Sequence, residues 1–117
     1  MSASEQERTL TLRAPGGEVR CEVAATPLRR MRGLLGRSGL ESGRGLLLRP
    51  AGSIHTAFMR FPIDAVFLDG EGTVLRIAAD LPPWRAAAAR GARSVLELAA
   101  GEAERRGVSV GAKLAPG

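Results

Sequence analysis

The middle of the chain, residues 65–77, reads AVFLDGEGTVLRI and carries the clearest fold signal in the sequence. The runs 65–68 and 73–77 are rich in apolar and β-branched residues, which favour strands. The four residues between them include Gly70 and Gly72, and glycine adopts the positive φ of a tight turn at little cost. The stretch therefore predicts a β-hairpin.

Outward from this hairpin, polar and apolar residues alternate with the period of half-buried strands. A Pro-Gly-Gly turn at 15–17 joins two such segments into a second hairpin, and prolines at 62 and 82–83 bend or break the chain. The predicted strands cover residues 9–13, 18–23, 45–49, 54–59, 65–68, 73–77, 94–98 and 108–114.

Helical signals are few. Thr26-Pro27 is typical of a helix start, and Leu28, Met31 and Leu35 then share one face, which predicts one short helix near residues 27–36. Residues 101–106 predict a single helical turn closed by Gly107. Residues 84–93 contain an alanine run, but an isolated helix of this length is marginal, so we expect an extended or irregular segment.

The sequence thus predicts a mostly β (α+β) fold: a small antiparallel β-barrel or strongly curved sheet with one short helix. The 117 residues, 44% of them hydrophobic, suit one core, so we expect a single domain over residues 9–117 after a disordered N-terminal tail, residues 1–8. The single cysteine, Cys21, alternates with Val19 and Val23, which predicts a small hydrophobic core residue.

Charge, targeting signals and membrane segments limit the possible partners. The formal net charge is +5, and residues 29–49 hold all of this excess, with six arginines against Glu41. No signal peptide or membrane span is recognisable, so we expect a cytoplasmic protein without a membrane partner. The arginines favour an anion or nucleic acid, but no aromatic residues are interleaved with them, and we prefer a solvated basic surface.

Three motifs resemble the bacterial and archaeal family called domain of unknown function 192. They are RGLLGR at residues 32–37, HTAFMRFPIDAVFLD at residues 55–69 and VLELAAG at residues 95–101. The sequence departs from the family at Phe58, where tryptophan is common, and at Ala112, where an acidic residue is common. The resemblance implies a small β-barrel or curved sheet with one short helix, and it implies no particular activity.

The candidate site lies around the 55–64 motif. The single histidine, His55, is either structural, a ligand contact or a metal ligand, but no second histidine or cysteine pair is available, so we predict neither a metal nor a cofactor. Thr56, Met59 and Asp64 surround the Phe61-Pro62 bend and either line a small pocket or serve packing and backbone hydrogen bonds.

Glu97 alternates with Leu96 and Leu98, so its side chain belongs on the opposite face of the strand. It is either solvated or paired with an arginine such as Arg32 or Arg37. The predicted ligand-binding residues are therefore Arg32, Arg37, His55, Thr56, Met59, Asp64 and Glu97.

We prefer a non-enzymatic binding or accessory module with a small-ligand pocket near residues 55–64, because the sequence contains no complete catalytic constellation. One alternative is an enzyme of unknown reaction that uses His55 and Asp64 as an acid-base pair. The other is a nucleic-acid or anion binder that acts through Arg29–Arg49. The partner, whether a small molecule or a protein, is not identified by the sequence.

Overall fold

The computed structural model describes residues 9–24, 42–57 and 59–116. The elements in these ranges are β1 (Thr9–Ala14), β2 (Gly17–Ala24), β3 (Arg44–Leu48), β4 (Ser53–His55), β5 (Ile63–Leu68), β6 (Val74–Leu81), β7 (Ala86–Ala88), β8 (Ser94–Ala99), α3 (Glu102–Arg105) and β9 (Ala115–Pro116). No helix in these ranges has the length and apolar character needed to span a bilayer.

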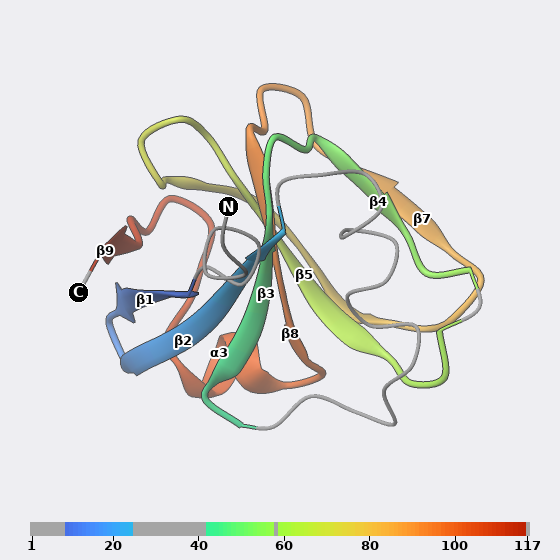
Figure 1. Cartoon of the computed structure of the whole chain (residues 1–117), viewed down its shortest axis with the longest axis horizontal. Coiled ribbons are helices and arrows are strands. Elements are labelled where there is room, and N and C mark those ends of the chain that lie inside the picture. Colours follow the sequence, from blue (N-terminus) through green and yellow to red (C-terminus); the bar gives the residue numbers. More distant parts are fainter. Residues whose placement is uncertain (1–8, 25–41, 58, 117) are drawn as a thin grey trace, which may run out of the picture.

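One seven-stranded sheet dominates the fold, in the order β6-β5-β8-β3-β2-β1-β9. It curls strongly into a half-barrel, and a separate two-stranded sheet, β4-β7, lies beside it (Figure 1). The predicted mostly β fold with a strongly curved sheet is confirmed.

The sheet is not wholly antiparallel, because β2 and β3 pair in parallel, with Cys21 opposite Gly45 and Val23 opposite Leu47. A parallel pair cannot be joined by a tight hairpin and needs a long connection. Here the connection runs from the end of β2 to Arg44 and includes the predicted helix 27–36, which lies outside the described residues. The same holds for the predicted tail, residues 1–8.

The hairpin at residues 69–72 joins β5 to β6 as the sequence predicts. The Asp69 carboxylate accepts the amides of Thr73 (2.9 Å) and Glu71 (2.8 Å), and these hydrogen bonds lower the pKa of Asp69. Gly72 has a φ of 86°, and a Cβ there would lie 2.5 Å from the Leu114 carbonyl oxygen. Both the backbone conformation and the available space therefore require glycine at this position.

The central strands β3, β5 and β8 are buried on both faces, so two apolar cores form. The first core comprises Leu12, Val19, Cys21, Val23, Leu47, Val66, Leu68, Val74, Leu96, Leu98, Ala103, Val108 and Leu114. The second core comprises Leu46, Leu48, Ile54, Met59, Ile63, Ala65, Phe67, Ala87 and Val95. Because Ile54 and Ala87 belong to the second core, the β4-β7 sheet covers that face of the large sheet.

Most local predictions are confirmed, and two are wrong. Cys21 is a buried core residue as predicted, and its burial raises the pKa of the thiol to about 12. Residues 86–88 are extended, and α3 forms the predicted helical turn. The predicted strand 108–114 is wrong: only Lys113 makes an isolated bridge, and β9 follows at Ala115. The predicted strand 54–59 is too long, because β4 ends at His55.

Candidate functional site

A groove of about 560 Å³ is lined by residues of the β4-β7 sheet and by Arg76 of β6. Its lining residues are Ser53, Ile54, His55, Arg76, Ala86, Ala87 and Ala88. Ser53 and His55 are exposed and stand two residues apart on β4, whereas Ile54 between them is buried in the second core. Their cross-strand neighbours are Ala88 and Ala86, whose small side chains leave room above the strand pair.

Arg76 brings a guanidinium group to this groove from β6. Its Nη1 donates a hydrogen bond of 2.6 Å to the Ala88 carbonyl, and its guanidinium carbon lies 5.9 Å from the centre of the Phe67 ring. A guanidinium has more N–H donors than this bond uses. The lining residues thus offer a cation, an imidazole and a hydroxyl, and none of them is acidic.

Thr56 follows β4 directly and organises the loop that precedes β7. This fully buried residue donates its hydroxyl to the Pro82 carbonyl (2.8 Å), and the same oxygen accepts the Arg85 amide (2.7 Å). The Thr56 amide donates to the Arg85 carbonyl (2.7 Å), and the Thr56 carbonyl accepts the Trp84 amide (3.0 Å). The hydrogen bonds of Thr56 therefore go to the protein backbone, which gives it a positioning role.

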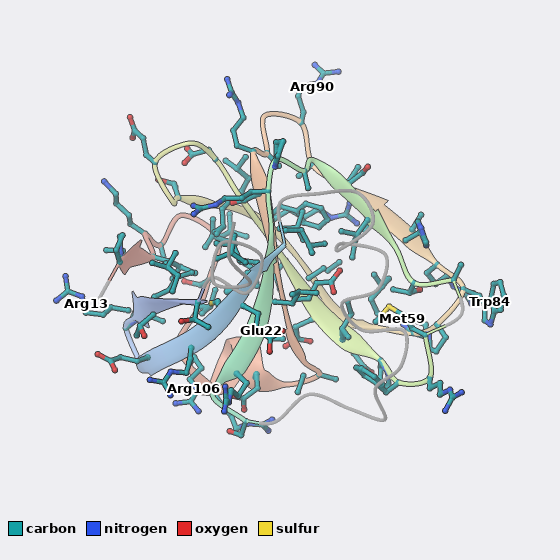
Figure 2. The ribbon with its side chains drawn as sticks, in the orientation of Figure 1. Arg13, Glu22, Met59, Trp84, Arg90 and Arg106 are labelled. Carbon is teal, nitrogen blue, oxygen red and sulfur yellow. The ribbon has the colours of Figure 1, made fainter. Side chains whose placement is uncertain are left out.

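The loop that Thr56 holds contains Trp84 in an unusual backbone conformation. Trp84 has a φ of 65°, in the left-handed region that bulky residues rarely adopt. Its side chain is 60% exposed, and Figure 2 shows it at the outer tip of the molecule, pointing away from the ribbon. Met59 lies at the same end of the molecule but is buried in the second core.

Asp64 and His55 are not brought together. The buried Asp64 carboxylate accepts backbone amides from Asp80 (2.8 Å), Gly101 (3.0 Å) and Ala103 (3.0 Å), so it ties β5 to β6 and to the start of α3. Its neighbours Ile63 and Ala65 face the second core, so Asp64 points to the opposite face of the sheet, away from β4. An acid-base pair of His55 and Asp64 has no geometric basis in this arrangement.

Glu97 lies on the opposite face of β8 from Leu96 and Leu98, as alternation predicts, but it is not solvated. Its side chain is only 4% exposed and stands in register between Leu46 and Ala65. Burial raises the pKa of this carboxyl to about 8. Its predicted partners Arg32 and Arg37 lie outside the described residues 9–24, 42–57 and 59–116.

Sequence reasoning missed Arg76, Ser53, Trp84 and Glu102. Glu102 is buried on α3 and accepts hydrogen bonds from the Gly43 amide (2.9 Å), Ser42 (3.1 Å), Arg105 (2.6 Å) and Arg106 (3.1 Å). Burial by itself would raise the pKa of Glu102, but these hydrogen bonds outweigh that effect and lower the pKa to about 2. No group of three His, Cys, Asp or Glu side chains in the described part of the chain could hold a metal ion.

The comparisons with known proteins agree with this fold. The family model for domain of unknown function 192, described as "Uncharacterized ACR", matches residues 10–116, and the chain belongs to this family. A protein of unknown function from Novosphingobium aromaticivorans is similar over 91% of this chain and 82% of its own, with 26% identity and a TM-score of 0.78. A protein from Sinorhizobium meliloti, described as a proposed transcription regulator, is similar over 92% of both chains, with 26% identity and a TM-score of 0.80. No curated protein matches the chain.

Proposed function

We propose that this protein is a non-catalytic binding module whose groove over the β4-β7 sheet takes a small anionic ligand such as a phosphate or carboxylate. The observation that carries the proposal is the meeting of Arg76, His55 and Ser53 around one groove without any acidic lining residue. Guanidinium, imidazole and hydroxyl groups all donate hydrogen bonds to oxyanions. The small alanine side chains leave the floor of the groove open to such a ligand.

The alternative of an enzyme has less support, because Asp64 lies on the face of the large sheet that is turned away from β4, which carries His55. The alternative of a nucleic-acid binder depends on Arg29–Arg49, and most of that segment lies outside the described residues. The S. meliloti neighbour is described as a proposed transcription regulator. A small-ligand module is also compatible with a regulatory role, in which the bound anion would be the signal.

Isothermal titration calorimetry with inorganic phosphate tests the proposal. We expect saturable binding that weakens by about tenfold or more in Arg76→Gln, because a charged hydrogen bond contributes about 1.5–3 kcal/mol. Arg76→Lys keeps the charge but loses the planar fork, so its affinity should fall in between. Arg13→Gln is the matched control, since Arg13 is an exposed arginine on β1, at the opposite side of the molecule (Figure 2).

Thermal unfolding of each variant separates loss of binding from loss of fold, because Arg76 also bonds to the Ala88 carbonyl. Equal phosphate affinity of Arg76→Gln and Arg13→Gln would contradict the proposal. The absence of saturable binding to the unmodified protein would do so as well.

A further inference from the structure

The strand β7 of the small sheet has one open backbone edge. Among the described strands it pairs with β4 alone. The hydrogen bond from the Thr56 amide to the Arg85 carbonyl (2.7 Å) extends the β4-β7 ladder by one residue in the same register. Because hydrogen-bonded pairs alternate along an antiparallel ladder, Ala87 turns its amide and carbonyl towards β4, whereas Ala86 and Ala88 turn theirs away.

Arg76 binds one of these outward groups. Its Nη1 donates to the Ala88 carbonyl at 2.6 Å, so the guanidinium lies at one end of the open edge. The Ala86 carbonyl and the Ala88 amide lie on the same edge, which no described strand covers. In parallel pairing, one residue of an added strand donates its amide to a carbonyl of the edge and accepts the amide two residues further along. The Ala86 carbonyl and the Ala88 amide have this relation.

We propose that the groove binds the C-terminal end of an extended peptide, which pairs in parallel with β7 and places its terminal carboxylate on Arg76. This inference rests on the proposed anion binding and names the chemical class of the anion. The Ala86 carbonyl and the Ala88 amide hold the penultimate residue of the peptide. The next carbonyl of the edge, that of Ala88, is already bonded to Arg76. The added strand therefore ends at this point, where its carboxylate meets the guanidinium.

The chemistry of the groove suits the main chain of a peptide. Ala86 and Ala88 are exposed and small, and β7 contains no proline or charged residue that would hinder strand addition. A guanidinium can hold a carboxylate through two parallel N–H donors, and no acidic side chain lines the groove. An inorganic anion accepts hydrogen bonds only, so it cannot use the Ala86 carbonyl, whereas a peptide amide can. Strand addition and capture of a terminal carboxylate are both recurring modes of peptide recognition.

Fluorescence anisotropy tests the proposal on the unmodified protein. The probe is a pentapeptide of alternating valine and threonine with an N-terminal label and a free C-terminal carboxylate. We expect it to bind about tenfold or more tightly than acetate, because backbone hydrogen bonds add to the carboxylate contact. Amidation of its C-terminus should weaken binding by about tenfold or more, since the charged hydrogen bonds are lost.

Two N-methylated peptides test the pairing with β7. Methylation of the penultimate amide removes the donor to the Ala86 carbonyl and should weaken binding by about fivefold or more. Methylation of the last amide is the matched control, because in parallel pairing this amide points away from β7 and its loss should leave the affinity unchanged. Equal weakening by the two methylations would overturn the proposed pairing.

The outcomes also separate this inference from the proposed function. Arg76→Gln should bind the peptide acid and the peptide amide equally, whereas Arg13→Gln should keep the preference for the acid. Equal binding of acid and amide by the unmodified protein would refute the capture of a carboxylate. If acetate and phosphate bind but the peptide acid binds no more tightly, the peptide inference fails and the anion groove stands. If neither anion nor peptide binds, both proposals fail.

Discussion

At the scale of single residues, Glu97 places an ionisable carboxyl group among apolar neighbours in the middle of the sheet. Its pKa is about 8 in the folded protein against 4.5 for an unperturbed glutamate. Below pH 4.5 both the folded and the unfolded chain hold the proton, so Glu97 contributes no pH dependence there. Between pH 4.5 and about 8 the unfolded chain releases the proton while the folded chain retains it, so stability falls as the pH rises.

We therefore expect Glu97→Gln to flatten the decline of stability across this window. Since one pKa unit corresponds to about 1.4 kcal/mol, the full effect over the shift from 4.5 to about 8 is roughly 5 kcal/mol in the free energy of unfolding. Urea unfolding at a series of pH values from 5 to about 8 measures it. Glu104→Gln, at an exposed glutamate on α3, is the control, and an equally steep decline in Glu97→Gln and in the control would show that Glu97 is not the cause.

Thr56 shows how one buried hydroxyl positions a whole loop. Thr56→Val keeps the shape and the β-branch but removes the acceptor of the Arg85 amide and the donor to Pro82. We expect a loss of about 2 kcal/mol in the free energy of unfolding, because a buried amide is left unsatisfied. Acrylamide quenching of Trp84 should also change as its loop is released. Thr56→Ser retains the hydroxyl, and if it loses as much stability as Thr56→Val, the hydrogen bonds are not responsible.

At the scale of elements, α3 is too short to be stable alone and depends on Glu102. Its carboxylate joins this helix to the Ser42-Gly43 turn before β3. The folded pKa of about 2 lies below the ordinary value of 4.5, so the stabilisation is complete above pH 4.5 and is lost as the pH falls towards 2.

We expect Glu102→Gln to lower the free energy of unfolding by about 3 kcal/mol at neutral pH, since the paired Arg105 and Arg106 lose their buried carboxylate. The variant should also lose less stability than the unmodified protein on acidification below pH 4.5. Chemical unfolding at neutral and acidic pH measures both effects. An acid response identical to that of the unmodified protein would contradict the role given to Glu102.

The same scale shows which elements the sequence could reveal. The hairpin at residues 69–72 and the helical turn at α3 are formed by neighbouring residues. The turn residues and the spacing of apolar residues along the chain were therefore sufficient to predict them. The parallel pairing of β2 with β3 depends on a contact across a long connection, and no local pattern encodes it. Residues 108–112 resembled a strand because apolar residues alternate there, but Val108 packs in the first core whereas Val110 is exposed, and the backbone forms a turn.

For the candidate site, the alternation of Glu97 with Leu96 and Leu98 correctly predicted which face of the strand Glu97 occupies. It could not predict that Glu97 is buried, because burial depends on what covers that face. His55 was recognisable as the single histidine. Arg76 could not be distinguished from the other arginines among the sixteen in the sequence, because only the folded structure places it beside the groove. Asp64 looked like a pocket residue because its distant partners, the amides of Gly101 and Ala103, are brought to it only by folding.

At the scale of the whole molecule, the candidate groove lies at the β4-β7 sheet, beside the large curled sheet. The groove presents Arg76, His55 and Ser53, and the loop before β7 presents Trp84. His55, which lines the groove, and Thr56, which holds this loop, are the first two residues of the long motif at residues 55–69. In the proposed function, the folded body is a scaffold that positions the small β4-β7 sheet for anion binding.

The most direct test of the central claim is a titration of the isotopically labelled protein with inorganic phosphate, followed by amide chemical shifts in NMR. The account predicts saturable shifts concentrated at Ser53, His55, Arg76 and Ala86–Ala88, with β1 and β9 unaffected. Shifts confined to other parts of the chain, or no saturable shift at these residues, would contradict anion binding in the groove.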